Sequence, residues 1–228
     1  MTRRKCAEGF VSNKKARKQT KLNEKRKENT RTEREAVIIA CEDSVSAPLY
    51  FKNLFHDLIT NHAIAASSLV IVKHGHTDPY GVLQDMLQYD DYKDFTHKWI
   101  VIDRDEERTN GGGHPLENFN RAIAEASKKK INVAYSNPCF EIWYLLHFEY
   151  RNTPIDRDEL YRKLVEELGY SKDNLPDLIP AQQSSAIKYA KNLIESWVSM
   201  QGETKPASDN PSTTVHELVE VLNGLKTI

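Results

Sequence analysis

Four short apolar runs in the first two thirds of the chain predict buried strands. They cover residues 36–41, 69–72, 99–102 and 131–135. Runs without a polar residue at every second position are typical of strands whose two faces are both covered, as in parallel sheets. We therefore expect these four segments to form the centre of the fold.

Apolar residues recur at helical spacing between and after these strands. The predicted helices cover residues 46–62, 78–87, 115–129 and 139–148. Asp78 and Pro79 are a favourable N-cap and first residue for the second of them. Strands that alternate with helices predict an α/β fold, with a parallel sheet of about four strands and helices on both faces.

The last third of the chain has a different pattern. Amphipathic helices are predicted at residues 156–168, 182–200 and 213–225, with loops rich in Pro, Asp and Ser between them. We interpret residues 151–228 as a helical C-terminal subdomain that packs on an α/β domain at residues 35–150. Residues 1–34 have few large apolar side chains and are expected to form a flexible arm.

Charge is divided unevenly along the 228 residues, although the net charge is only −1. Residues 1–35 carry a net charge of +8, and the remainder carries −9. A basic arm on an acidic body is expected where the arm meets a polyanion, so nucleic acid is the predicted partner. A solubilising tail, or a helix that packs on another protein, is the alternative. The candidate phosphate contacts are Lys14, Lys15, Arg17, Lys18, Lys25, Arg26 and Lys27.

Several classes of protein are excluded by composition. No apolar stretch is long enough for a membrane-spanning helix, and the first 30 residues hold no apolar signal segment. The three cysteines, Cys6, Cys41 and Cys139, are far apart and form no Cys-x-x-Cys pair. This usage argues against a disulfide scaffold or a cysteine zinc site and fits a reducing cytoplasm. We expect a cytoplasmic protein with no membrane partner.

Acidic residues follow two of the predicted strands. Glu42 comes directly after the first strand, and Asp103 and Asp105 come directly after the third. Ligands of open parallel sheets bind beyond the carboxyl ends of the strands, where these acids are expected to meet. Carboxylates gathered in this way repel one another unless a cation lies among them, and oxygen ligands select Mg²⁺ or Mn²⁺. The alternative is a solvated loop at residues 103–108 with internal ion pairs.

A metal held by these acids would clamp phosphate and activate water, as hydrolysis of a phosphodiester requires. Glu141, near the start of the helix after the fourth strand, could add a ligand or a general base. It could instead stabilise the N-terminus of its helix. His74 and His76 lack a further pair of zinc ligands, so we reject a zinc site there.

The placement of Glu42 and of Asp103-Arg104-Asp105 resembles that of the Toprim domain. Longer blocks resemble the RloB-like family, and they lie at residues 39–42, 50–51, 77–79, 102–105, 133–143, 145–148 and 210–219. The resemblance implies a Toprim-type nuclease of bacterial anti-phage or abortive-infection loci. It implies cleavage of nucleic acid, either RNA such as tRNA or DNA, with Mg²⁺ or Mn²⁺ as cofactor. It also implies control by a partner ATPase of the ABC or SMC-like kind, and it leaves a homo-oligomer open.

Under this resemblance Glu42, Asp103 and Asp105 are the metal ligands. Glu141 is predicted from its position after the fourth strand to assist them as a catalytic residue. One position departs from the family pattern. Many relatives have a second Glu about one helical turn after the first, whereas this chain has Ala47. Asp43 could supply the missing carboxylate, or water could complete the metal's coordination. Otherwise the site is weakened, and the chain is a nucleic-acid-binding adaptor subunit of a defence complex.

Overall fold

The computed structural model describes residues 35–62, 65–106, 112–171 and 179–225. The predicted basic arm and its candidate phosphate contacts, from Lys14 to Lys27, lie outside these residues. Within the described part of the chain, no helix is both long enough and apolar enough to cross a membrane.

A five-stranded sheet forms the centre of the molecule. Its strands are β1 (Val37–Cys41), β2 (Leu69–Ile71), β3 (His97–Asp103), β4 (Asn132–Asn137) and β5 (Ser212–Thr213). They are arranged in the order β2-β1-β3-β4-β5. The first four strands are parallel, as predicted, and β5 pairs antiparallel with the end of β4. The short strand β5 was not predicted.

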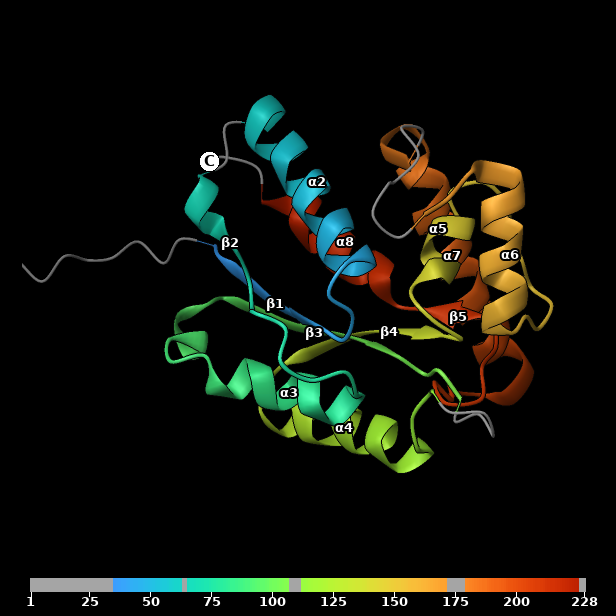
Figure 1. Ribbon diagram of the computed structural model, residues 1–228, viewed down its shortest axis with the longest axis horizontal. Helices are drawn as coiled ribbons and strands as arrows, with labels where there is room; N and C mark the ends of the chain where they lie inside the picture. The colour runs from blue at the N-terminus through green and yellow to red at the C-terminus, as the bar shows by residue number, and fades with distance from the viewer. Residues whose placement is uncertain (1–34, 63–64, 107–111, 172–178, 226–228) are drawn as a thin grey trace, which may run out of the picture. The chain divides into compact units, whose positions relative to one another are not determined.

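Helices cover both faces of the sheet (Figure 1). The helices are α2 (Ser46–His62), α3 (Pro79–Gln88), α4 (Leu116–Lys128), α5 (Glu141–Leu145), α6 (Arg157–Leu168), α7 (Ile179–Gln201) and α8 (Val215–Gly224), with short 3₁₀ turns η1 (Ala66–Ser68) and η2 (Tyr92–Asp94). Helices α3 and α4 lie on one face, and α2 and α8 lie on the other, with α5, α6 and α7 beside the β4–β5 end (Figure 1). The predicted α/β class, with helices on both faces, is confirmed, and it is consistent with a Toprim-like fold.

The two layers explain why the strands read as continuous apolar runs. Ile38 and Ile100 point into the core beneath α3 and α4. Their neighbours Ile39 and Val101 point into the core on the opposite face. Successive side chains of a strand alternate between faces, so a strand with both faces covered needs apolar residues at every position.

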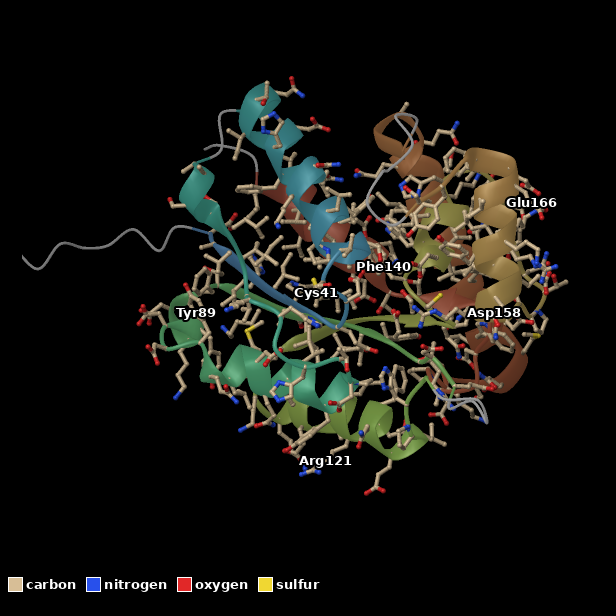
Figure 2. The ribbon with its side chains drawn as sticks, viewed as in Figure 1. Cys41, Tyr89, Arg121, Phe140, Asp158 and Glu166 are labelled. Carbon is tan, nitrogen blue, oxygen red and sulfur yellow. The ribbon has the colours of Figure 1, made fainter. Side chains whose placement is uncertain are left out.

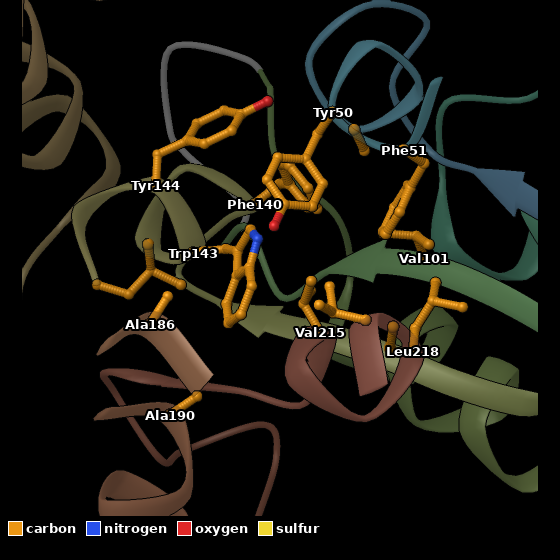
Figure 3. Close-up of a cluster of buried hydrophobic side chains, with 14 of the residues drawn as sticks. Tyr50, Phe51, Val101, Phe140, Trp143, Tyr144, Ala186, Ala190, Val215 and Leu218 are labelled. Carbon is orange, nitrogen blue, oxygen red and sulfur yellow. The ribbon is translucent and has the colours of Figure 1, made fainter. Parts of the chain in front are cut away.

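The C-terminal helices share a core with the sheet. Ala186 and Ala190 of α7 and Leu218 of α8 belong to the same buried cluster as Val101 of β3 and Trp143 of α5 (Figure 3). Residues 35–228 accordingly group into one compact unit. The predicted packing of a helical C-terminal part on the sheet is therefore present, and this part also supplies β5.

Helix α5 is shorter than the helix predicted over residues 139–148. Only Glu141–Leu145 is α-helical. Tight turns flank it, in which the backbone N–H of Ile142 bonds to the Cys139 carbonyl and that of Phe148 bonds to the Leu145 carbonyl. Such bonds between residues three positions apart keep the chain coiled, so the apolar pattern of a longer helix persists in the sequence.

Candidate active site

The order of the strands creates a switch point between β1 and β3. The chain leaves β1 through α2 to reach β2 on one side, and returns through α3 to reach β3 on the other side. The two connections lie on opposite faces of the sheet, and open α/β sheets usually bind their ligands beyond the strand ends at such a point. Glu42 follows β1 and Asp103 ends β3, so both acids stand at this switch point.

Glu42 and Asp103 are in contact, although 61 positions separate them along the chain. The backbone N–H of Asp103 donates a hydrogen bond of 2.9 Å to Oε2 of Glu42. The backbone N–H of Glu42 donates to the Val101 carbonyl at 3.0 Å, which continues the β1–β3 ladder beyond its last paired residue. Both acids are buried. The structure thus brings together the two acids on which the predicted site depends.

Burial and crowding disfavour negative charge at this position. Burial raises the pKa of the Asp103 carboxyl well above its usual value, and the carboxylates of Glu42 and Glu141 raise it further. Burial also raises the pKa of Glu42, although the hydrogen bond from His114 opposes the shift. No hydrogen-bond donor reaches the Asp103 carboxylate within the described residues. The positive charge of Arg157 opposes these shifts at Asp103.

His114 is a basic partner of Glu42, and it was not predicted. Its Nε2 lies 2.5 Å from Oε1 of Glu42, and this contact raises the pKa of the imidazole. The loop before α4 places it there, because the backbone N–H of His114 bonds to the Asp105 carbonyl at 2.8 Å. Gly113 makes that turn with φ of 75°, and a Cβ there would lie 2.0 Å from the Glu106 carbonyl oxygen. The glycines that precede His114 are the feature of the sequence that could have indicated this turn.

Asp105 is neutralised by an arginine from another element. Its carboxylate forms an ion pair with Arg157 in the first turn of α6. The predicted cluster therefore contains Asp105 as well, although in the described residues its carboxylate faces a cation from α6. Arg157 was not predicted, because no pattern in the sequence around it indicates a contact with the end of β3.

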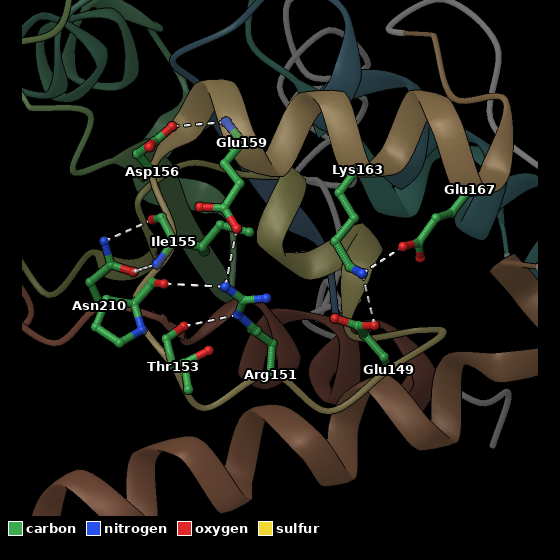
Figure 4. A network of polar contacts seen from close by, with 10 residues as sticks. Glu149, Arg151, Thr153, Ile155, Asp156, Glu159, Lys163, Glu167 and Asn210 are labelled. Carbon is green, nitrogen blue, oxygen red and sulfur yellow. Dashed lines mark hydrogen bonds and ion pairs between the residues drawn. The ribbon is translucent and has the colours of Figure 1, made fainter.

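Polar contacts fix the position of α6 (Figure 4). The side chain of Asp156 caps the helix by accepting from the backbone N–H of Glu159 at 2.8 Å. Arg151 bonds to Glu159 at 3.2 Å, and Lys163 bonds to Glu149 at 3.1 Å. These contacts hold α6 against the segment that precedes it. They therefore help to position Arg157 beside Asp105.

Asp43 serves as the N-terminal cap of α2. Its carboxylate accepts hydrogen bonds from the backbone N–H groups of Ser46 at 2.6 Å and Ala47 at 3.1 Å, and from the Ser46 hydroxyl. Such caps satisfy backbone donors that have no partner inside the helix. Ala47 itself is buried in the first turn of α2. In this arrangement the carboxylate of Asp43 is engaged by α2.

Glu141 completes the cluster from the other side of the sheet edge. It is 3% exposed and is the first residue of α5. Its Oε1 accepts a hydrogen bond of 3.1 Å from the Tyr170 hydroxyl and a longer one of 3.4 Å from Ser46. Its charge contributes to the raised pKa of Asp103. Glu141 thus lies within electrostatic reach of Asp103.

The donor atoms of the cluster suit a hard divalent cation, since they are carboxylate oxygens. Within the part of the chain that the structure describes, however, no three His, Cys, Asp or Glu side chains converge on a position for a metal ion. In this structure Glu42 is engaged by His114, and Asp105 by Arg157. The carboxylate oxygens fit Mg²⁺ or Mn²⁺ in chemistry, and these two basic side chains lie beside them.

Comparison with known proteins places the chain in a family. The family model described as RloB-like protein matches residues 37–222. The chain belongs to the RloB-like family. The match runs from β1 into α8 and therefore includes the carboxylate cluster and Arg157. Searches of curated proteins and of solved structures found no match.

Proposed function

We propose that this RloB-like chain is a metal-dependent phosphodiester hydrolase, a nuclease of bacterial anti-phage defence. The observation that carries the proposal is the contact between Glu42 and Asp103 at the switch point of the sheet, with the charges of Asp105 and Glu141 within electrostatic reach. Glu42 and Asp103 are buried acids with raised pKa values, which are typical of functional sites. Membership of the RloB-like family supports the same interpretation.

Each residue of the cluster has a proposed role. Glu42, Asp103 and Asp105 would hold Mg²⁺ or Mn²⁺. The ion, when bound, supplies a Lewis acid for the phosphate and lowers the pKa of water. Glu141, held by the Tyr170 hydroxyl, would orient the attacking water and accept its proton. Arg157, once released from Asp105, would stabilise the charge that develops on the phosphate.

The remaining parts of the function follow from the family and from charge. The basic arm at residues 1–34, including Lys14 to Lys27, would hold the nucleic acid through its phosphates. The substrate would be RNA such as tRNA, or DNA. A partner ATPase of the ABC or SMC-like kind would control the activity.

A second candidate is a nucleic-acid-binding adaptor with a weakened site. It is favoured by Ala47, which leaves no carboxylate one turn after Glu42, and by the engagement of Asp43 in the cap of α2. An adaptor would bind nucleic acid and its partner without cleavage.

A cleavage assay separates the two candidates. Full-length wild type would be incubated with tRNA, single-stranded DNA and duplex DNA, with Mg²⁺, Mn²⁺ or EDTA, alone and with the co-expressed ATPase. We expect cleavage that requires metal and falls at least about 100-fold in Asp103→Asn, because a bound metal contributes several kcal/mol. Asp94→Asn is the matched control, since Asp94 is an exposed acid in η2 before β3, at the opposite end of that strand. Equal cutting by Asp103→Asn would refute the assigned site, and binding without any cutting would support the adaptor.

A further inference from the structure

A pocket runs along α6 beside the carboxylate cluster. Its volume is about 510 Å³, which lies within the range typical of sites for small ligands. One wall consists of Cys139 and Glu141, and the other is a face of α6. Glu141 and Arg157 therefore belong both to this pocket and to the acidic cluster.

The wall formed by α6 has two parallel rows of side chains. One row is Arg157, Tyr161 and Val165, and the next is Asp158, Arg162 and Glu166. Members of a row are four residues apart, which corresponds to about 6 Å along the helix. The Asp158 end of the helix lies toward the sheet, and the Glu166 end lies away from it (Figure 2). Arg157 and Asp158 thus lie nearer the cluster, and Val165 and Glu166 lie farther out.

The middle of the pocket combines an exposed aromatic ring with a cationic side chain. Tyr161 is 39% exposed and Val165 is 40% exposed. The Tyr161 ring is held edge-on against Tyr170, with centroids 5.8 Å apart. Arg162, in the next row, forms no ion pair within the described residues. An aromatic platform beside a cation is the usual means of holding single-stranded nucleic acid, where the ring stacks on a base and the cation meets a phosphate.

We propose that this pocket binds one nucleotide of a single strand, with the base stacked on Tyr161 and the phosphate between Arg157 and Arg162. The inference rests on the proposed nuclease function, because it assigns the pocket to the strand that the cluster would cleave. Three carboxylates, those of Glu141, Asp158 and Glu166, also line the pocket. Their repulsion of phosphate opposes this binding mode, so stacking on Tyr161 and the contacts with the arginines have to outweigh it. A base in a duplex is already stacked, so a duplex would not fill the pocket.

Binding in EDTA tests this subsite without any cleavage. The probes are a labelled single-stranded oligonucleotide, an abasic strand of the same length and a duplex, each titrated into full-length protein by fluorescence anisotropy. The abasic strand keeps every phosphate, so contacts with the basic arm are equal for both strands. We expect Tyr161→Ala to weaken binding of the normal strand about tenfold and to leave the abasic strand unchanged. Arg162→Gln should weaken both strands equally.

Lys163→Gln is the matched control, because it removes one positive charge from the same helix on the side that faces Glu149. It should leave the ratio of the two affinities as in wild type. The subsite is refuted if Tyr161→Ala weakens both strands equally or neither. If wild type cleaves and Tyr161→Ala keeps the wild-type ratio of affinities for the normal and abasic strands, the subsite is refuted and the nuclease function stands. If Tyr161→Ala loses the preference for the normal strand but wild type never cleaves, the subsite stands and the nuclease function is refuted.

Discussion

Asp105 and Arg157 form an ion pair that joins the end of β3 to the first turn of α6. The two residues are 52 positions apart in the chain. The side chain of Asp105 is 7% exposed and that of Arg157 is 28% exposed, so the pair is largely shielded from water. Removing one member of such a pair leaves the other charge without compensation. The pair therefore couples the packing of α6 to the charge state of the acidic cluster.

Arg157→Gln should lower the free energy of unfolding in EDTA by about 1–3 kcal/mol, because the buried Asp105 carboxylate loses its ion pair with Arg157. Added Mg²⁺ should then stabilise the variant more than it stabilises wild type, since the ion would replace the positive charge that Arg157 supplied. Urea denaturation with and without Mg²⁺ measures both effects. Arg162→Gln, one turn along the same helix, should behave like wild type. A variant as stable as wild type in EDTA, with no larger response to Mg²⁺, would contradict this account of the pair.

Substitutions of Asp43 separate its role as a cap from a role as a ligand. Asp43→Ala should lower the free energy of unfolding by about 1 kcal/mol, because the first N–H groups of α2 lose their acceptor. Asp43→Asn should cost little, because Asn caps helices as well as Asp does. We expect Asp43→Asn to cleave like wild type in the assay proposed above. Loss of cleavage with unchanged stability in Asp43→Asn would make Asp43 the substitute ligand for the Glu absent at position 47.

Local pattern was sufficient to predict the framework of the fold. Strands buried on both faces leave apolar runs, and the helices that cover them leave helical periodicity, so β1 to β4 and α2 to α4 were predicted nearly in place. Strand β5 has two residues, Ser212 and Thr213, which is too short for any periodicity. Its pairing with β4 depends on how α7 and α8 pack, which no local pattern encodes.

The acids of the site could be predicted, but their counter-charges could not. Glu42, Asp103 and Asp105 follow buried strands, and parallel strands bring their carboxyl ends to one edge. His114 and Arg157 reach the same edge through a folded loop and a packed helix. Only the tertiary structure sets these contacts, so the sequence suggested repelling carboxylates without showing what balances them.

Gly113→Ala should destabilise the loop that positions His114. A Cβ at Gly113 would overlap the Glu106 carbonyl, whereas at Gly169, with φ of 62°, it would meet nothing within 4 Å. Gly169→Ala is therefore the matched control for the backbone strain alone, which costs about 1–2 kcal/mol. We expect Gly113→Ala to lose more stability than Gly169→Ala in urea denaturation. It should also lower the pKa of His114 toward its usual value, measured by NMR titration, because the contact with Glu42 is lost. Equal losses and an unchanged pKa would contradict the overlap.

His147 should make the fold sensitive to mild acid. It is buried against Tyr50 and Trp143, where its Nδ1 bonds to the Trp143 carbonyl at 2.8 Å. Its Nε2 is buried without a hydrogen-bond partner in the described part of the chain. Burial lowers the pKa of His147 to about 4, with backbone hydrogen bonds opposing the shift. Since the pKa is lowered in the folded state, the neutral imidazole favours folding above the unfolded pKa, near about 6.5.

That contribution should be lost as the pH falls from about 6.5 through about 4, because the unfolded chain takes up a proton that the folded chain resists. The loss amounts to about 3 kcal/mol. His147→Phe keeps an aromatic ring in the same surroundings and removes the titration. Urea denaturation at several pH values should therefore show wild type losing about 3 kcal/mol more than His147→Phe between neutral and acid pH. His56→Phe, on the exposed side of α2, should retain the wild-type slope. Parallel curves for wild type and His147→Phe would mean that the folded protein accommodates a charged His147, contrary to the burial of both ring nitrogens.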